Sequence, residues 1–260
     1  MTTASNELQP APIYNRILAA LPADEFRTLL PHLEEATVPV GTILANYRDS
    51  LDRLFFPNNG MVSLLSVNEN GYACEVGYVG FEGVVCMTPL IGKNELPYQA
   101  LVQATSTGYF LPLSIAEKVF AANGTFHDAV LRFSYVVVKQ ASQTCACNHF
   151  HPIRSRMCRW FTVMCERSGD RNLSVTQEFL AHMLGVQRTT IGHIASTLQA
   201  ESIIRYRRGR VEIIDFEGLR DAACECYWIV REEYLHYLNS DEVLPMSTTR
   251  QTAAAEHFIL

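Results

Sequence analysis

The segment TQEFLAHMLGVQRTTIGHIASTLQA, residues 176–200, decides the fold of this chain. Its apolar residues form two short stripes at helical spacing, separated by one glycine, Gly185. The first stripe consists of Phe179, Leu180, Met183 and Leu184, and the second of Ile191, Ile194, Ala195 and Leu198. Thr176 can cap the first helix, and Glu178 falls in its first turn, where the helix dipole favours an anion. The pattern predicts a helix, a tight turn and a second helix.

A helix pair that reads DNA needs a small residue at the helix crossing, a turn residue that tolerates positive φ, and an apolar inner face on the second helix. Ala181, Gly185 and the second stripe meet these needs. The outer face of the second helix is polar and has no acidic residue; it consists of Gln187, Arg188, Thr189, Gly192, His193 and Ser196. A plain amphipathic helical hairpin has a similar pattern, so these residues alone leave that alternative open.

A predicted β-hairpin follows the helix pair. Residues 203–215 read IIRYRRGRVEIID, two β-prone runs on either side of an Arg-Gly tip, which is typical of a wing. Arginines at a hairpin tip beside a reading helix can contact DNA phosphates. The residues predicted to contact DNA are Thr176, Gln187, Arg188, Thr189, Thr190, His193, Arg207, Arg208 and Arg210.

The charge distribution points to the same part of the chain. The net charge is −6, which by itself argues against a nucleic-acid partner. Residues 150–215, however, hold 10 Lys or Arg and 6 Asp or Glu (+4), whereas residues 1–149 (8 and 13) and 216–260 (3 and 8) each carry −5. All ten cations of the positive segment are arginine, whose planar fork fits guanine edges and phosphates.

The composition is that of a globular chain with one or two domains: 260 residues, of which 48% are hydrophobic. No apolar run reaches membrane-spanning length. The first residues, MTTASNELQPAP, lack the basic and apolar regions of a signal peptide. A cytoplasmic location is therefore expected.

The eight cysteines include no CxxC pair, which argues against a disulfide framework and a zinc ribbon. Two Cys-x-Cys pairs occur, Cys145 with Cys147 and Cys224 with Cys226. Residues two apart on a helix point to opposite sides, because two steps rotate by about 200°. The sequence thus predicts that neither pair shares a metal, and we expect no metal site and no cofactor.

Residues 38–113 have the sequence pattern of an all-β module. Short β-prone runs are predicted at residues 42–44, 54–56, 61–67, 73–79, 100–105 and 109–111. Residues 57–60 and 68–71 read as hairpin-type turns, while Gly77, Gly80 and Gly83 punctuate a corner. The predicted fold class is α+β, with an antiparallel β-barrel or jelly roll that can either enclose a ligand or be solid.

Residues 126–150 form a long predicted helix with too few polar residues for a solvated side, so it needs two partners. Phe133 and Val137 can cover the β module. A seam at heptad spacing suits a second copy of the chain and consists of Leu131, Ser134, Val138, Ala141, Cys145 and Asn148. A central helix within one subunit is the alternative.

Four regions are expected. They are an N-terminal part with packing helices and a sensor-like β domain (1–125), a dimerisation helix (126–150), a winged helix-turn-helix domain (151–238), and a weakly ordered tail (239–260). Within the third region, residues 153–167 are predicted to be helical after Pro152, and residues 216–238 to form one final helix.

The order of β module, long helix, helix-turn-helix and wing resembles the CRP/FNR superfamily of bacterial transcription regulators over roughly residues 15–236. The most specific parts are HPIRSRMCRWF (151–161), LSVTQEFLAHMLGVQRTTIGHIASTLQAESIIRYRRGRVEIIDFEGL (173–219) and the corner EVGYVGFEGVV (75–85). The resemblance implies a homodimer that reads palindromic promoter sites and contacts RNA polymerase.

The chain departs from well-studied members at two places. Their reading helix begins Ser-Arg-Glu-Thr-Val-Gly-Arg, of which this chain keeps only the first arginine, as Arg188; Thr189 replaces the glutamate and His193 the second arginine. Cyclic-nucleotide sensors hold the phosphate with Arg-Ser/Thr-Ala, where this chain has Tyr98, Gln99 and Ala100.

Effector chemistry is therefore open. The possible effector pocket implied by the resemblance consists of Gly80, Glu82, Gly83, Tyr98 and Gln99. An iron–sulfur centre of the oxygen-sensor type is not expected, since no cysteine precedes Cys74. Three histidines near the long helix keep a haem-type sensor open: His127, His149 and His151.

The predicted function is a dimeric DNA-binding transcription regulator without catalytic activity. One alternative is a cyclic-nucleotide-responsive regulator in which backbone amides of residues 80–83 hold the phosphate. A remote alternative is a cupin-like metal enzyme, which needs clustered histidines in the strands, although residues 38–113 contain none.

Overall fold

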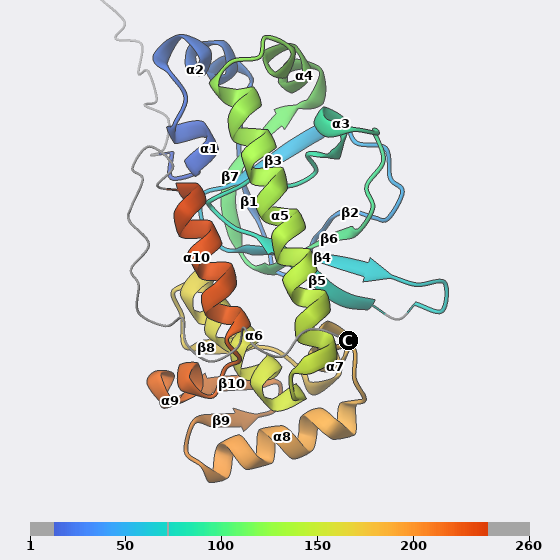
Figure 1. Cartoon of the computed structure of the whole chain (residues 1–260), viewed down its shortest axis with the longest axis vertical. Coiled ribbons are helices and arrows are strands. Elements are labelled where there is room, and N and C mark those ends of the chain that lie inside the picture. Colours follow the sequence, from blue (N-terminus) through green and yellow to red (C-terminus); the bar gives the residue numbers. More distant parts are fainter. Residues whose placement is uncertain (1–12, 72, 239–260) are drawn as a thin grey trace, which may run out of the picture.

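The computed structural model describes residues 13–71 and 73–238 (Figure 1). The predicted tail, residues 239–260, lies outside the described residues, as do residues 1–12 and Tyr72. A β-rich domain occupies the upper part of Figure 1 and a helical domain with a small sheet the lower part, and one long helix, α5 (Thr125–Phe150), runs along both.

The β domain consists of two antiparallel sheets. The first has the order β1 (Glu34–Val38), β7 (Ser106–Pro112), β3 (Arg53–Pro57), and the second the order β2 (Ile43–Ala45), β6 (Gln99–Ala104), β4 (Met61–Val67), β5 (Ala73–Val79). The antiparallel β module is confirmed, but the two sheets do not join into a closed barrel. Phe55, Phe56, Leu64 and Leu65 are buried in its core.

The two predicted hairpin turns differ. Residues 68–71 connect β4 to β5, which pair with each other, so this hairpin is confirmed. Residues 57–60 do not form a hairpin, because β3 pairs with β7 whereas β4 pairs with β5 and β6. The chain crosses between the sheets here. Gly60 has φ +74°, and a Cβ there would lie 2.6 Å from the carbonyl oxygen of Thr105, so the crossing requires glycine.

Short helices cover the ends of the β domain. They are α1 (Arg16–Ala19), α2 (Ala23–Leu29), a 3₁₀ turn η1 (Leu30–His32), α3 (Thr88–Ile91) and α4 (Leu113–Ala121). Asn15 anchors α1: its side-chain carbonyl caps the helix, and its amide donates to the carbonyl oxygens of Pro57 (2.9 Å) and Gly83 (2.7 Å). The sequence reading missed β1, α3 and α4.

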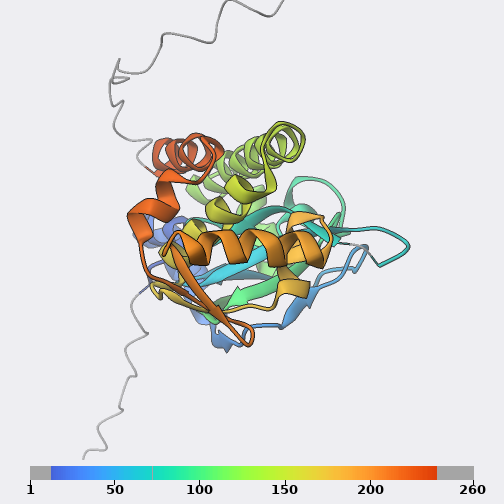
Figure 2. The same ribbon diagram turned by 90° about the horizontal axis from the view of Figure 1, so that it is seen from below.

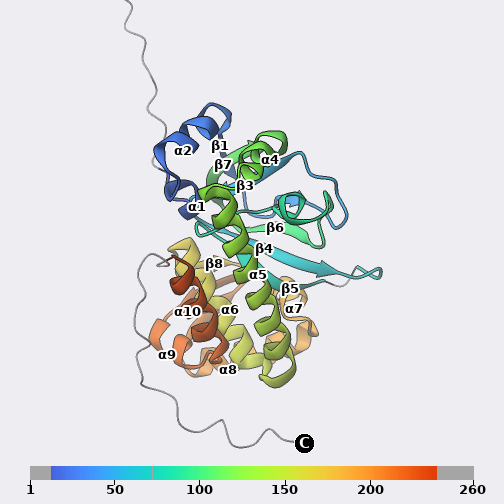
Figure 3. The same ribbon diagram turned by 45° about the horizontal axis from the view of Figure 1, so that its top comes forward.

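Helix α5 packs on β5 along one side and on the last helix, α10 (Cys226–Leu238), along another (Figures 1 and 3). Phe133 is fully buried and meets Gly83 of the β domain, as expected. The packing of α10 against α5 was not foreseen. A third side stays open in the single chain, with Leu131 40% and Val138 63% exposed.

The helical domain begins with α6 (Ile153–Ser168), which follows Pro152 as predicted. The prediction of one final helix over residues 216–238 is wrong. α9 (Phe216–Asp221) packs on α6 and α10 packs on α5, so the chain turns between them at residues 222–225. Among the described residues, no helix is both long enough and apolar enough to cross a membrane.

Candidate DNA-binding surface and the contacts that position it

The helix-turn-helix is formed by α7 (Gln177–Leu184) and α8 (Arg188–Ala200). Thr176 caps α7, because its hydroxyl accepts a hydrogen bond from the amide of Phe179 at 3.1 Å. Gly185 adopts the left-handed conformation, φ +64°, and the Val186 amide donates to the carbonyl oxygen of Ala181. Ile191, Ala195 and Leu198 of α8 are buried. The predicted helices, turn and inner face are confirmed.

The wing is a hairpin of β9 (Ile204–Arg207) and β10 (Arg210–Ile213). Arg208 and Gly209 at its tip have φ +48° and +75°, which fits the two-residue turn that twists with its strands. A third strand, β8 (Asn172–Ser174), pairs with β10 and was missed in the sequence. This sheet fixes the wing tip beside α7, where a Cβ on Gly209 would lie 3.4 Å from the methyl group of Thr176.

Helix α8 runs beside the wing along the lower side of the helical domain (Figure 2), and most of the predicted DNA-contacting residues are exposed. Thr190 is only half-buried, whereas the others are exposed: Thr176, Gln187, Arg188, Thr189, His193, Arg207, Arg208 and Arg210. A groove of about 500 Å³ lies between the start of α7, Arg188 and the wing tip at Arg208 and Gly209.

Tyr206 also lines this groove and was not singled out in the sequence. Its hydroxyl donates to the carbonyl oxygen of Val175 at 2.8 Å, which ties the wing to the segment before α7. Burial raises the pKa of Tyr206 to about 12, so the phenol stays protonated and keeps this hydrogen bond. A single β-prone aromatic residue gives no sequence signal for such a role.

The arginines of this surface divide into paired and unpaired groups. Arg205 pairs with Glu212 across the wing at 2.6 Å, and Arg154 pairs with Glu201 at 2.5 Å. Four others have no carboxylate within ion-pair distance in the part of the chain that the structure describes: Arg188, Arg207, Arg208 and Arg210.

Two of the unpaired arginines face each other. Arg207 and Arg210 are directly opposite in the ladder between β9 and β10. Like charges at such positions destabilise a hairpin. An anion that binds between them would remove this repulsion, and a DNA phosphate is such an anion.

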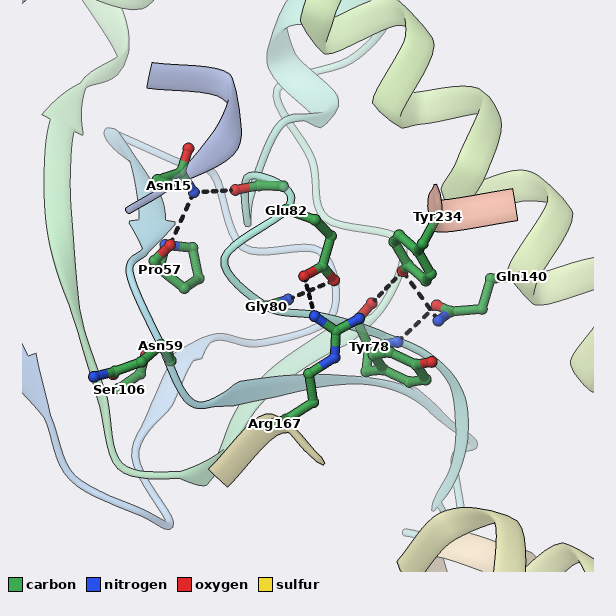
Figure 4. Close-up of polar contacts among 11 residues, drawn as sticks. Asn15, Pro57, Asn59, Tyr78, Gly80, Glu82, Ser106, Gln140, Arg167 and Tyr234 are labelled. Carbon is green, nitrogen blue, oxygen red and sulfur yellow. Dashed lines mark hydrogen bonds and ion pairs between the residues drawn. The ribbon is translucent and has the colours of Figure 1, made fainter. Parts of the chain in front are cut away.

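A buried ion pair connects the β domain to the helical domain (Figure 4). Arg167, near the end of α6, donates to the carboxylate of Glu82, which is fully buried in the loop after β5. The guanidinium also lies over the rings of Tyr78, Phe81 and Tyr234, with its carbon 5.3–5.5 Å from the ring centroids. Burial alone would lower the pKa of Arg167, but the Glu82 carboxylate raises it, so the arginine remains charged.

The same cluster reaches α5 and α10. The amide nitrogen of Gln140 donates to the Tyr234 hydroxyl at 3.1 Å, and its carbonyl accepts from the backbone amide of Tyr78 at 2.8 Å. The Tyr234 hydroxyl donates to the carbonyl oxygen of Tyr78. Glu82, Arg167, Gln140 and Tyr234 thus join four separate segments, and we call them the interdomain lock.

The five residues of the possible effector pocket are not brought together. Gln99 pairs with Leu65 at one end of β4, whereas Val79, which precedes Gly80, pairs with Val62 near the other end. The Gly80 amide donates to Glu82, and the Gly83 amide to the carbonyl oxygen of Gly80. Tyr98 is buried, and the amide of Gln99 donates to the side chain of Asn46.

A different cleft, of about 530 Å³, lies between the two domains. Its walls come from β6, from the end of α6 and from the segment that leads into α7. Apolar side chains that line it include Leu101, Trp160, Met164 and Phe179. No local pattern in the sequence indicates this cleft, because its walls come from segments about 60 residues apart.

The three histidines considered for haem occupy different environments. His127 stacks on Phe120 and contacts Asp128, His149 is exposed, and His151 contacts Glu225 and Cys226.

The comparisons with known proteins agree with this geometry. Residues 155–222 match the Crp-like helix-turn-helix domain family. A sequence comparison with curated proteins gives no match. The C-terminal domain is therefore a Crp-like helix-turn-helix domain rather than a plain helical hairpin.

Solved structures share the whole fold. A transcriptional regulator of the CRP/FNR family from Eubacterium rectale has a TM-score of 0.66 and 14% identity, covering 80% of this chain and 98% of that one. FixK2 from Bradyrhizobium japonicum has a TM-score of 0.61 and 11% identity, covering 74% of this chain and 98% of that one. The c-di-GMP responsive global regulator CLP from Xanthomonas campestris has a TM-score of 0.58 and 16% identity, covering 74% of this chain and 99% of that one.

Proposed function

We propose that this chain, which combines the fold of CRP/FNR regulators with a Crp-like helix-turn-helix domain, is a homodimeric regulator that binds specific promoter sites. The observation that carries the proposal is a set of four exposed arginines that have no carboxylate partner among the described residues. Arg188 and Arg208 line the groove between the start of α7 and the wing tip, and Arg207 and Arg210 lie opposite each other on the two strands of the wing. The enzyme alternative has no support from the matched proteins, which are regulators.

The two arginine groups have different roles in this proposal. Arg188 opens α8, the helix that enters the major groove in related domains, so it can offer its paired donors to a guanine edge. Gln187, Thr189 and His193 are exposed beside it and complete the reading face. Arg207, Arg208 and Arg210 lie on the wing and hold phosphates, which fixes the register of α8.

The second copy joins along the open side of α5. The seam residues Leu131, Val138, Cys145 and Asn148 are exposed, and Ser134 and Ala141 are half-buried, on the side that α10 and β5 leave uncovered. A leucine and a valine exposed in register along a 26-residue helix favour a helix partner. Two-fold pairing there presents two copies of α8 to a palindromic site.

The β domain of this regulator does not respond to cyclic nucleotides through the corner at residues 80–83. The amides of Gly80 and Gly83 are already hydrogen-bonded, and the buried carboxylate of Glu82 repels a phosphate. The cleft beside Trp160 and Met164 better fits a small apolar effector, because it borders both domains. RNA polymerase is a further partner of the regulator. The regulator acts in the cytoplasm, where promoter DNA lies.

A genome-wide binding profile of the full chain tests the proposal. Enriched sequences should be inverted repeats with half-site centres about one helical turn, roughly 10 base pairs, apart. Arg188→Ala should abolish the enrichment of these sites, whereas Arg171→Ala, which changes an exposed arginine outside α8 and the wing hairpin, should retain it. Enrichment of single, unpaired half-sites would contradict the dimer, and an absence of any enriched sequence would contradict sequence-specific binding.

A further inference from the structure

Three cysteines and one histidine converge where α5 ends, on the side of the helical domain. They are Cys147, His151, Cys224 and Cys226, and one ligand atom from each lies within 4.8 Å of all the others. The Sγ atoms of Cys147 and Cys224 are 3.5 Å apart, and Nδ1 of His151 is 3.4 Å from Sγ of Cys226. The three cysteines are buried, and His151 is half-buried.

Two segments of the chain supply these residues. Cys147 lies on the buried side of the last turn of α5, and His151 follows at the end of this helix, four residues later. Cys224 lies in the turn between α9 and α10, and Cys226 is the first residue of α10. Because residues 222–225 are not helical, the two cysteines are not held on opposite sides of a helix. The sequence-based argument against a shared site therefore fails for this pair, although it holds for Cys145, which is exposed.

The spacing of the four atoms fits a single tetrahedral ion. With zinc–sulfur bonds of about 2.3 Å, two thiolates of a tetrahedral zinc site lie roughly 3.8 Å apart, and a thiolate and an imidazole nitrogen slightly closer. The two measured separations, 3.5 Å and 3.4 Å, need only small adjustments to reach this geometry. A cluster of several irons bridged by sulfide would hold its cysteines farther apart, so this tight set does not suit one.

The surroundings also match a metal site. Nε2 of His151 lies 2.9 Å from a carboxylate oxygen of Glu225. A carboxylate on the outer nitrogen is the usual partner of a metal-binding histidine, because it orients the ring and directs the free nitrogen to the metal. The side-chain amide of Gln143 donates to Sγ of Cys226 at 3.0 Å, as second-sphere donors to metal thiolates do.

Positive charge is available for the thiolates. One ion of charge +2 with three thiolates leaves a net charge of −1, which needs a cation nearby when it is buried. Arg156 and Arg159 of α6 are buried and interact electrostatically with Cys147, and their Nε atoms have no hydrogen-bond partner among the described residues.

We propose that Cys147, His151, Cys224 and Cys226 bind one structural zinc ion that joins the end of α5 to the turn between α9 and α10. All four positions are filled by protein, so the ion has no open coordination site and is structural rather than catalytic. It ties the proposed dimerisation helix directly to the DNA-binding domain, at the opposite end of α10 from the interdomain lock. This proposal does not depend on the proposed effector or on the DNA site.

Metal analysis of the full chain tests the proposal. The protein is produced in zinc-supplied medium, purified under reducing conditions without chelator, and analysed for zinc by mass spectrometry. The wild type should hold one zinc per chain. Cys145→Ser is the matched control, since Cys145 is exposed two residues from Cys147, and should hold the same amount. Cys147→Ser and Cys224→Ser should lose zinc at least tenfold more readily to a weak chelator.

A measurement on the unsubstituted chain covers the case in which these variants fail to fold. Chelator-treated wild type is titrated with Co²⁺, which should produce thiolate-to-cobalt charge-transfer bands and the intense visible bands of tetrahedral cobalt, and Zn²⁺ should abolish both. A cobalt spectrum like that of the hydrated ion would overturn the proposal. So would equal zinc retention by Cys147→Ser and Cys145→Ser, or a Cys147–Cys224 disulfide in place of zinc in the freshly purified protein.

Discussion

Replacing Arg167 by methionine tests the interdomain lock directly. Methionine keeps much of the aliphatic packing against Tyr78, Phe81 and Tyr234 but removes the charge that pairs with Glu82. The Glu82 side chain is fully buried and the Arg167 side chain only 14% exposed, so solvent screens this pair weakly. Removing one partner of a buried pair typically costs about 3–5 kcal/mol, because the other charge stays buried without compensation.

The pair's own coupling emerges from a double-mutant cycle. Glu82→Gln keeps a carbonyl oxygen for the Gly80 amide and removes the negative charge. The double variant, Arg167→Met with Glu82→Gln, buries neither charge, so it should be less destabilised than the sum of the single variants by roughly 1–3 kcal/mol. Urea unfolding at pH 7, followed by circular dichroism and tryptophan fluorescence, gives the four free energies. Both probes are needed, because two domains can unfold separately.

Arg171→Met serves as the control. Arg171 lies three residues beyond the end of α6 and is exposed. Its guanidinium lies over the ring of Phe216, and it has no carboxylate partner among the described residues. Its replacement should change the free energy of unfolding by less than about 1 kcal/mol. If the effects of Arg167→Met and Glu82→Gln are simply additive, the two residues do not act as a pair. If Arg167→Met costs no more than Arg171→Met, the contact contributes nothing to the connection between domains.

Val138→Glu should turn the proposed dimer into monomer or aggregate in sedimentation experiments, since it would bury an unpaired carboxylate in the proposed seam at a cost of several kcal/mol. An unchanged dimer would show that the seam lies elsewhere. Calorimetry with cyclic AMP should detect no micromolar binding, because Tyr98 and Gln99 replace the phosphate ligands of related sensors and a lost charge-assisted contact costs about 2–5 kcal/mol. Arg188→Ala should weaken binding to the cognate site by about 1–3 kcal/mol and leave binding to random DNA unchanged. Arg208→Ala should weaken binding to both DNAs and reduce the slope of log K against log salt by about 1. If Arg188→Ala weakens binding to cognate and random DNA equally, Arg188 is a phosphate contact. Burial raises the pKa of Glu75 in the folded state, so the stability that the protonated side chain contributes is complete below the unfolded-state pKa of about 4.3 and is lost as the pH rises through the folded-state pKa. In urea unfolding from pH 5 to pH 8, Glu75→Gln should therefore gain stability relative to the wild type. A difference in stability that stays constant over this range would mean that Glu75 titrates normally.

The parts of the fold that the sequence predicted well have local signals. In the helix-turn-helix, apolar spacing, the cap at Thr176 and the turn at Gly185 each depend on residues within one or two helical turns. The wing turn at Arg208 and Gly209 is similarly local. Eight of the nine residues predicted from these signals to contact DNA are exposed in the structure. The ninth, Thr190, is half-buried, because it lies next to the inner residue Ile191.

The parts that the sequence did not reveal depend on packing between distant segments. The turn between α9 and α10 contains neither glycine nor proline, and it arises because the two helices pack on different partners, α6 and α5. Without that turn, Cys224 and Cys226 cannot face Cys147. The interdomain lock likewise joins residues 85 and 94 positions apart, Arg167 with Glu82 and Tyr234 with Gln140. No periodicity in a single sequence reports such pairings.

The placement of these contacts on α5 suggests how the two domains communicate. Gln140 and Cys147 are seven residues apart, two helical turns, so they lie on the same side of α5. There Gln140 contacts Tyr234 of α10, and Cys147 contacts Cys224 in the turn before α10. The lock holds the middle of the helix to the β domain through Tyr78, and the proposed zinc site holds its end to the helical domain. Because both contacts use one side of the helix, the open seam with Leu131 and Val138 can shift against a second copy without breaking either. In the proposed dimer, an effector that alters the β domain would reposition α8 through rotation of α5 at the proposed seam, with each subunit moving as a unit.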